Sequence, residues 1–146
     1  MIRLTRQYKF AASHRLHSVA LSEAENQRVY GKCNNPYGHG HDYVLQVVLS
    51  GPVHPETGLV VHLGQLDVFV ARSVLDTMRN NNLNDLPDFQ TIVPTTENLA
   101  VVAERHLRAR WQGAFPEHGS VTLVGVRVLE TARNSFESSG VRNERT

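Results

Sequence analysis

Residues 42–50 (DYVLQVVLS) constrain the fold more than any other segment, because a β-branched and apolar run of this kind predicts a strand. Residues 2–10 (IRLTRQYKF) alternate roughly between polar and apolar side chains, which is typical of a strand with one buried face. The stretch 51–58 (GPVHPETG) is dense in turn-forming residues. After this turn, residues 59–63 can form a short strand that runs back in the opposite direction. These segments therefore predict strands that pair through hairpins.

Two helices are predicted in the middle of the chain. Residues 65–79 carry apolar side chains at helical spacing. A second helix is predicted over residues 97–110, where Thr95 or Thr96 can cap the first turn. The polar segment 18–30 is expected to be a loop or a short helix.

Residues 120–131 (SVTLVGVRVLET) predict a strand that is apolar on both faces. One face is expected to carry Val121, Leu123, Gly125, Arg127 and Leu129. Apolar side chains on both faces indicate a central position in an assembly. A last short strand follows, and the tail is expected to fray from about residue 138. The order strand, strand, helix, helix, strand, strand predicts an α+β fold with antiparallel pairing, in one domain over residues 1–146.

The composition indicates an ordinary globular protein, with 40% hydrophobic and 20% charged residues. A net charge of +1 gives no reason to expect nucleic acid or a membrane surface as a partner. No apolar run approaches the roughly 18 residues that span a bilayer, and the N-terminus lacks the apolar core of a signal peptide. The single cysteine, Cys33, cannot form an internal disulfide. We therefore expect a cytoplasmic protein.

Residues 31–43 (GKCNNPYGHGHDY) indicate a metal site. His39 and His41 are two residues apart, so both side chains point to the same face if they enter the following strand. With a third imidazole they would form a three-histidine zinc site, which leaves one position open for water or substrate and is typically catalytic. His14 is the first candidate for the third ligand. His17 is the competitor, although it would face the other side of a regular strand.

Other interpretations of these residues stay open at this point. A histidine pair with one spacer also occurs by chance, and a structural metal site would need a fourth ligand, for instance Cys33. Cys33 alone is typical of a buried small apolar residue. Neighbouring Lys32 and a nearby metal would lower the pKa of the thiol and favour a reactive thiolate. Gly38 and Gly40 are expected to let the backbone pass close to its neighbours.

The sequence resembles the 6-pyruvoyltetrahydropterin synthase family from about residue 8 to about residue 137. The matching segments are FAASHRLHS, LSEAENQRVYGKCNNPYGHGHDY, DVFVARSVL, PTTENLAV and VRVLET. Five residues separate the cysteine from HGH, which is the spacing of the pyruvoyl type. The related 6-carboxytetrahydropterin synthases of the queuosine pathway have only three residues there.

The resemblance implies a T-fold, in which two helices cover one face of a four-stranded antiparallel sheet. Three subunits would close their sheets into a twelve-stranded barrel, and two trimers would stack into a hexamer with active sites at the subunit interfaces. Such a homo-oligomer would also explain the strand with two apolar faces and provide partners for the sheet edges.

The resemblance also implies an enzyme, a zinc-dependent lyase of pterin biosynthesis. The zinc ligands of the family fall on His14, His39 and His41, and its catalytic cysteine falls on Cys33. The implied reaction starts from 7,8-dihydroneopterin triphosphate, eliminates triphosphate and gives 6-pyruvoyltetrahydropterin by an internal redox shift without nicotinamide. In it, zinc binds the side-chain oxygens while carbon-bound protons leave, and the thiolate is the base near C1′ and C2′.

The resemblance also implies substrate-binding residues in two segments, one around residue 96 and one at residue 130. Glu130 is the implied pterin anchor, because a carboxylate can accept two hydrogen bonds from a 2-amino-4-oxo pyrimidine edge. Thr95, Thr96 and Glu97 match the segment that lines the pterin pocket, a role that is compatible with helix capping. The chain has no glycine-rich phosphate loop, so the triphosphate is expected to meet scattered basic residues such as Arg15 or Lys32.

Two positions depart from the family. The family has a second proton-transfer group, an Asp-His pair shortly before Asn-Leu, where this chain has Arg79 and Asn80. Asparagine does not transfer protons near pH 7, and arginine stays charged. Loss of a general acid–base group typically costs about 10²- to 10⁴-fold in rate. The positive charge of Arg79 would favour a phosphorylated substrate.

Three outcomes follow from this departure. The enzyme runs the family reaction slowly, or His62 or His106 relays the proton. Alternatively it makes a different pterin, of the 6-carboxytetrahydropterin type or with a cleaved side chain. The third outcome is a non-catalytic zinc- and pterin-binding protein. An enzyme is favoured, because a binding protein would have less need of an open zinc position and a thiol.

Overall fold

One antiparallel sheet of four strands, in the order β1-β2-β3-β4, forms the framework of the computed structural model, which describes residues 1–140. The strands are β1 (Ile2–His14), β2 (His39–Gly51), β3 (Thr122–Leu129) and β4 (Ser135–Ser139). β1 and β2 pair along their whole lengths, so they form the longest ladder of the sheet.

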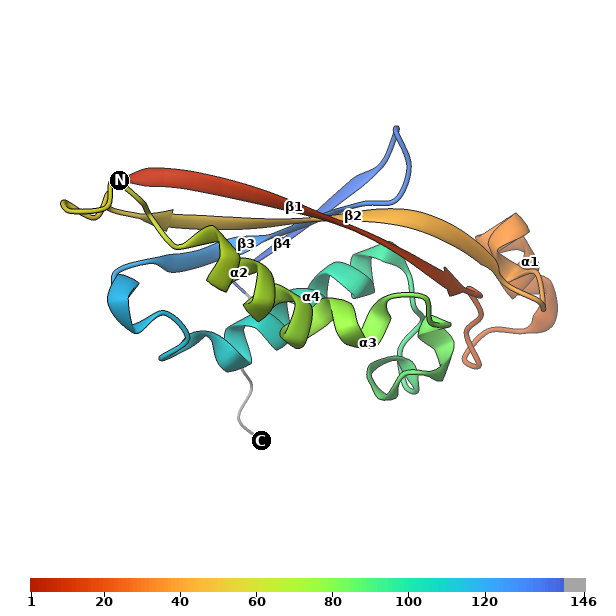
Figure 1. Cartoon of the computed structure of the whole chain (residues 1–146). Coiled ribbons are helices and arrows are strands. Elements are labelled where there is room, and N and C mark those ends of the chain that lie inside the picture. Colours follow the sequence, from red (N-terminus) through yellow and green to blue (C-terminus); the bar gives the residue numbers. More distant parts are fainter. Residues whose placement is uncertain (141–146) are drawn as a thin grey trace.

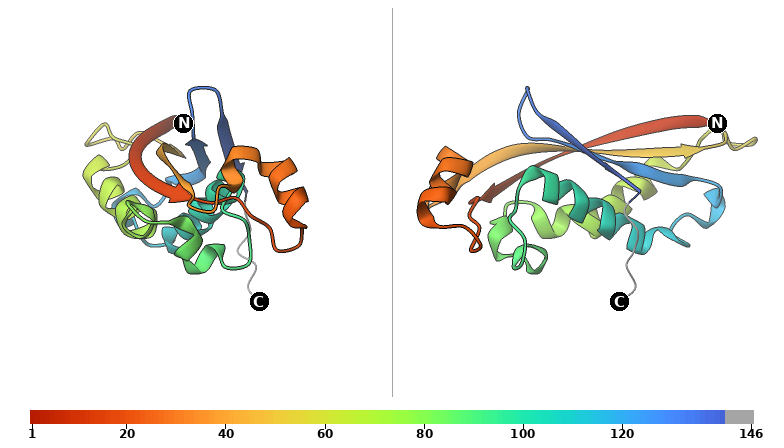
Figure 2. Two further views of the ribbon diagram at one scale, coloured as in Figure 1. Left: turned by 90° about the vertical axis from the view of Figure 1, so that its right-hand side faces the viewer. Right: turned by 180° about the vertical axis from the view of Figure 1, so that it is seen from behind.

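The longer helices cover one face of this sheet (Figure 1, Figure 2). α2 (Leu63–Val70), the π-helical turn η2 (Ala71–Leu75) and α3 (Asp76–Met78) follow one another without a break. α4 (Thr96–Trp111) lies beside them, and α1 (Glu23–Tyr30) lies at the end of the sheet away from the N-terminus. The short 3₁₀ turns are η1 (Gly31–Asn34), η3 (Leu83–Asp85), η4 (Pro87–Phe89) and η5 (Pro116–His118). Among the described residues, no helix is long and apolar enough to cross a membrane.

The four-stranded sheet with helices on one face confirms the predicted α+β fold. The short strand predicted over residues 59–63 is wrong, because His62 caps α2 and the helix begins at Leu63. The last strand, β4, ends at Ser139, close to residue 138, from which the tail is expected to fray. The rest of the predicted frayed tail, residues 141–146, lies outside the described residues.

The core lies between the sheet and the helices. It is built from alternate side chains of the strands and from the inward faces of α2, η2, α3 and α4. The largest fully buried apolar side chains are Tyr43, Leu45, Leu49, Leu66, Met78, Leu83, Leu99 and Leu107. Each fully buried side chain of this size contributes about 1.5–3 kcal/mol to folding, so the two halves of the chain hold one another in place.

A β-bulge in β3 changes which side chains face the core. The register against β2 shifts by one residue between Leu123 and Gly125, so Val124 is the extra residue. Leu123 is buried before the bulge, and Val126 and Val128 are buried after it. The predicted alternation is therefore wrong beyond the bulge, where Arg127 is exposed.

The bulge matters for the residues that follow β3. Because the buried positions after it are even-numbered, Glu130 continues the core-facing row and Leu129 does not. Gly125 is required at this point, since a Cβ there would lie 2.5 Å from the carbonyl oxygen of Ser138. The bulge thus turns a carboxylate towards the covered face of the sheet.

Candidate functional site

His14, His39 and His41 meet at one end of the β1–β2 ladder. His14 is the last residue of β1 and lies opposite His39, the first residue of β2. His41 follows on the same face of β2. One ring nitrogen of each residue lies within 4.8 Å of the others, and the ring centroids are 4.7–5.0 Å apart. The strand register alone therefore brings the three imidazoles together.

The ring nitrogens of this cluster are arranged to bind a cation. Nδ1 of the buried His14 donates to the carbonyl oxygen of Pro94 at 2.8 Å, so Nε2 keeps its lone pair. Burial lowers the pKa of His14, which keeps the ring neutral. His14 Nε2 lies 3.1 Å from His39 Nε2, close to the roughly 3.3 Å between two nitrogens that bind one tetrahedral zinc at about 2.0–2.1 Å. Nε2 of His41 is buried without a hydrogen-bond partner among the described residues. These features fit a bound metal ion.

Glu130 lies beside the histidine cluster. Its Oε1 is 3.3 Å from His41 Nε2, and its Oε2 accepts a hydrogen bond from the hydroxyl of Thr96. Thr96 is the buried first residue of α4. Thr95 is the N-cap, and its hydroxyl accepts from the backbone N–H of Asn98 at 3.2 Å. The start of α4 therefore holds the carboxylate in position.

Cys33 is a half-buried free thiol in η1. Its carbonyl accepts from Leu16 N at 2.8 Å, and Asn34 Nδ2 donates to Leu16 O at 2.8 Å, so η1 is held against the chain that leaves β1. Burial raises the pKa of the Cys33 thiol, and the charge of Glu130 raises it further. Lys32, which was expected to lower this pKa, is exposed and does not offset the two effects.

Gly38 and Gly40 were both expected to allow a close approach of the backbone, and the structure requires glycine only at the first of them. Gly38 has φ 70°, and a Cβ there would lie only 3.0 Å from the carbonyl oxygen of His14. At Gly40 a Cβ would lie 3.7 Å from the carbonyl oxygen of Ala12, an ordinary contact. Gly38 therefore allows the loop to approach the end of β1 just before His39.

Tyr43 is a residue of the site that the sequence patterns did not single out. It is fully buried, and its hydroxyl lies 3.3 Å from His14 Nδ1. Burial raises the pKa of Tyr43, the charge of Glu130 adds to this increase, and a hydrogen bond with Thr96 opposes it. Tyr43 is therefore a neutral hydroxyl beside His14 of the histidine cluster. The available signal was the two-residue period, because Tyr43 continues the row of the two histidines in β2.

Several other candidate residues lie away from the cluster. His17 Nδ1 is 3.1 Å from Asn34 Nδ2, so His17 is not the third ligand of the cluster. Glu97 is exposed on the first turn of α4. His62 caps α2, and His106 contacts Asp88 at 2.8 Å, so both suggested proton relays have structural roles of their own.

Arg79 and Asn80 follow α3 and lie at the edge of β1. Both are exposed. Asn80 has φ 59°, and its backbone N–H donates to the carbonyl oxygen of Ala11 at 2.7 Å. Asn80 and His41 both line an open hollow of about 430 Å³. The two diverged positions therefore lie at the margin of the site, on the surface of the chain.

Comparison with known proteins identifies the family to which this chain belongs. The family model "6-pyruvoyl tetrahydropterin synthase" matches residues 3–140. The chain belongs to this family. The 6-pyruvoyl tetrahydrobiopterin synthase of Homo sapiens is 43% identical over 132 residues, covering 90% of this chain and 86% of that protein. The synthase of Poecilia reticulata is 40% identical over 132 residues, covering 90% and 85%. The solved 6-pyruvoyl tetrahydropterin synthase of Caenorhabditis elegans superposes with a TM-score of 0.85 at 39% identity, covering 96% of both chains.

Membership of the 6-pyruvoyl tetrahydropterin synthase family confirms the resemblance inferred from the sequence motifs. The matched region includes Cys33, the three histidines and Glu130. The close superposition on a synthase of this family also confirms the T-fold of the single chain.

Proposed function

We propose that this chain is a zinc-dependent lyase of pterin biosynthesis, which eliminates triphosphate from 7,8-dihydroneopterin triphosphate and rearranges the side chain to 6-pyruvoyltetrahydropterin. One observation carries this proposal: three imidazole nitrogens converge, and the carboxylate of Glu130 lies beside them. The curated relatives at 40% and 43% identity bear the name of this synthase.

Zinc is the metal that the donor set suits best. Three neutral imidazoles leave a fourth coordination position open, as in catalytic zinc sites. The carbonyl of Pro94 fixes the ring of His14 with Nε2 towards the metal, which is the common role of an outer partner of a ligating histidine. When bound, zinc supplies a Lewis acid that polarises oxygens of the substrate side chain.

Glu130 is assigned to the pterin ring. A carboxylate has about four lone-pair sites, and Thr96 uses one of them, so the others can accept from the amino group and ring N–H of a 2-amino-4-oxo pyrimidine. Thr95 and Thr96 are assigned to the wall of the same pocket. The exposed Glu97 is assigned to its rim.

Cys33 is assigned the role of general base that removes carbon-bound protons from the substrate side chain. Its half-buried position leaves the sulfur open to a substrate that reaches the histidine cluster. A cation held by the three imidazoles would favour the thiolate and so oppose the effects of burial and Glu130. Arg15 donates to the carbonyl oxygen of Asn34 at 3.1 Å, and Lys32 precedes Cys33 in η1. Both cations are proposed to meet the triphosphate.

A homohexamer built from two trimers is the proposed assembly. β1 and β4 are the edge strands of the sheet in the single chain, and unpaired edges of this kind call for a partner. Twelve strands from three chains would close into a barrel, with active sites where subunits meet. The exposed Arg79 and Asn80, beside the edge of β1, would then face such an interface. A catalytic free thiol suits the reducing cytoplasm.

A different product from the same substrate is the second candidate function, and Arg79 and Asn80 are the observation that favours it. Neither side chain transfers a proton near pH 7. A site that binds the pterin but lacks the second proton-transfer group could stop part-way, cleave the side chain, or bind without turnover. Identification of the product by mass distinguishes these outcomes from the synthase reaction.

Substitution of Glu130 by Gln tests the assignment of the pterin pocket. We expect kcat/KM for triphosphate release from 7,8-dihydroneopterin triphosphate to fall about 10- to 100-fold, because hydrogen bonds to a charged group are lost. The zinc content should stay unchanged. Glu137→Gln, on the exposed surface of β4, is the matched control. An unchanged kcat/KM in Glu130→Gln would remove Glu130 from substrate binding.

A further inference from the structure

A cavity of about 580 Å³ lies between the α2–η2 helix and the C-terminal end of α4. This volume is in the range of pockets that hold small organic ligands, roughly 300–1,000 Å³. None of its lining residues belongs to the histidine cluster, to Cys33 or to Glu130. The proposed pterin chemistry therefore leaves this cavity without a role.

Ser73 is the residue that points to a ligand. It lines the cavity and is 5% exposed, and its hydroxyl is buried without a hydrogen-bond partner among the described residues. A serine within a helix usually bonds a backbone carbonyl of the preceding turn, which Ser73 does not do. Ser73 lies in the π-helical turn η2, and π turns occur frequently at functional sites. The hydroxyl is sheltered from solvent, so it bonds a molecule in the cavity once its side chain turns towards that molecule.

The two charged side chains that line the cavity are both cations. Arg72 and Arg110 line it, and Arg110 Nη1 donates to the carbonyl oxygen of Arg72 at 3.0 Å. Neither guanidinium is paired with a carboxylate in the described part of the chain. Nδ1 of His62 accepts from the backbone N–H of Gln65, so the neutral ring carries its hydrogen on Nε2. This set of donors suits an anion.

Apart from Gly64 and the exposed Gln65, the remaining wall of the cavity is apolar. Val68 is 50% exposed, and Phe69 and Ala114 lie close to it in the lining. Phe69 packs edge-on against Trp111 with ring centroids 5.5 Å apart. A ligand that fills the cavity would therefore combine an anionic head with an apolar body.

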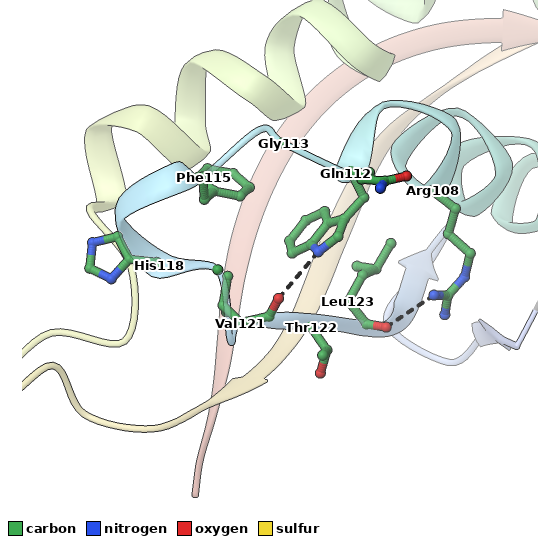
Figure 3. Close-up of a pocket in the computed structure, with 10 residues that line it drawn as sticks. Arg108, Gln112, Gly113, Phe115, His118, Val121, Thr122 and Leu123 are labelled. Carbon is green, nitrogen blue, oxygen red and sulfur yellow. Dashed lines mark hydrogen bonds between the residues drawn. The ribbon is translucent and has the colours of Figure 1, made fainter.

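A second cavity of about 480 Å³, between the end of α4 and β3, lacks these features (Figure 3). Arg108 there donates to Glu104 and to the carbonyl oxygens of Leu123 and Val124. The indole N–H of Trp111 donates to the carbonyl oxygen of Val121 at 3.3 Å. The guanidinium and the indole of this second cavity are thus bonded within the protein, unlike the two guanidinium groups beside Ser73, which face no carboxylate among residues 1–140.

We propose that the cavity beside Ser73 binds a small organic anion, namely a carboxylate or phosphate monoester that carries an apolar group. The anionic head accepts hydrogen bonds from Ser73 and from the guanidinium groups of Arg72 and Arg110. The apolar group packs on Val68 and Phe69. This site is separate from the pterin site, and its occupancy does not depend on zinc.

Binding of simple probe anions tests the proposal. 3-Phenylpropionate and phenyl phosphate represent the two head groups, and 3-phenylpropanamide is the uncharged control. Trp111 is the only tryptophan of the chain and contacts Phe69, so its fluorescence, excited at the red edge, reports on the cavity, and calorimetry gives an independent Kd. We expect a millimolar or tighter Kd for at least one anion and at least about tenfold weaker binding of the amide. The tighter anion identifies the head group.

Variants place the probe in this cavity. Arg72→Gln and Ser73→Ala should each weaken binding of the better anion about tenfold. Arg105→Gln, which removes the same charge from an exposed position of α4, should leave the Kd unchanged. Ser73→Ala should keep or raise the melting temperature, because the lost hydroxyl has no partner in the described chain. The proposal is overturned if neither anion binds, if the amide binds equally well, or if Arg72→Gln and Ser73→Ala both retain the wild-type Kd.

Discussion

Replacement of His39 by alanine is expected to remove the bound metal and to lower turnover by about 10³-fold or more, because metal polarisation of an oxygen contributes several kcal/mol to a transition state. His39 is the best of the three histidines for this experiment. It is half-buried, whereas His14 is 1% exposed and bonds to Pro94 in the core. The alanine variant should therefore keep its fold. Metal analysis after purification should give about one zinc per chain for the wild type and almost none for His39→Ala.

His118→Ala is the matched control for this prediction, since His118 is also half-buried but lies in η5, outside the cluster. It should retain both zinc and activity. Circular dichroism of His39→Ala should match that of the metal-stripped wild type. If His39→Ala keeps about one zinc per chain, the metal is held elsewhere and the three-histidine site is wrong.

Replacement of Cys33 by alanine is expected to lower kcat about 10²- to 10⁴-fold while zinc content and KM stay unchanged. The reason is that the thiol is the proposed base, whereas the metal is held by other residues and the pterin by Glu130. Cys33→Ser serves as the control for packing, because a hydroxyl has a similar shape but does not ionise near neutral pH. Its kcat should be as low as that of Cys33→Ala. A serine or alanine variant with wild-type kcat would exclude Cys33 as the base.

The pKa of Cys33 gives a second test of the same residue. Burial and the charge of Glu130 raise this pKa in the folded chain, so alkylation of metal-free protein by iodoacetamide should accelerate as the pH rises above neutrality. Glu130→Gln removes one of the two causes and should shift the alkylation profile to lower pH. Since Cys33 is the only cysteine, the measured rate belongs to this thiol alone.

The metal site could be predicted from local patterns to a large extent. The spacing of His39 and His41 places both on one face of any strand that contains them. The residues favoured His14 but could not exclude His17, because the choice depends on where β1 ends. β1 ends at His14, and the chain then turns away, so His17 contacts Asn34 instead.

The position of Glu130 depends on a feature with little signal in the sequence. Strict alternation from Leu123 would place Leu129 on the covered face and Glu130 on the opposite one. The bulge at Val124 reverses this, and it is stabilised by contacts between β3 and its neighbours that are far apart in the chain. The family resemblance indicated a role for Glu130 that the local pattern could not place.

The apolar spacing predicted where the helices lie, but it did not predict irregular turns within them. Residues 65–79 were correctly predicted as helical, but the π turn at Ala71–Leu75 left no periodic signature. This turn holds Ser73 inside a packed layer, next to a cavity that only tertiary contact with α4 creates. The candidate anion site therefore could not be inferred from the sequence.

We expect this chain to perform the synthase reaction although Arg79 and Asn80 occupy the positions of the family's Asp-His pair. Incubation of the zinc-loaded protein with 7,8-dihydroneopterin triphosphate under reducing conditions, followed by identification of the products by mass, tests this expectation most directly. We predict 6-pyruvoyltetrahydropterin and free triphosphate. Intact substrate, or a pterin of different mass, in the presence of bound zinc would show that the chain does not perform this reaction and would assign it to a changed reaction or to binding without turnover.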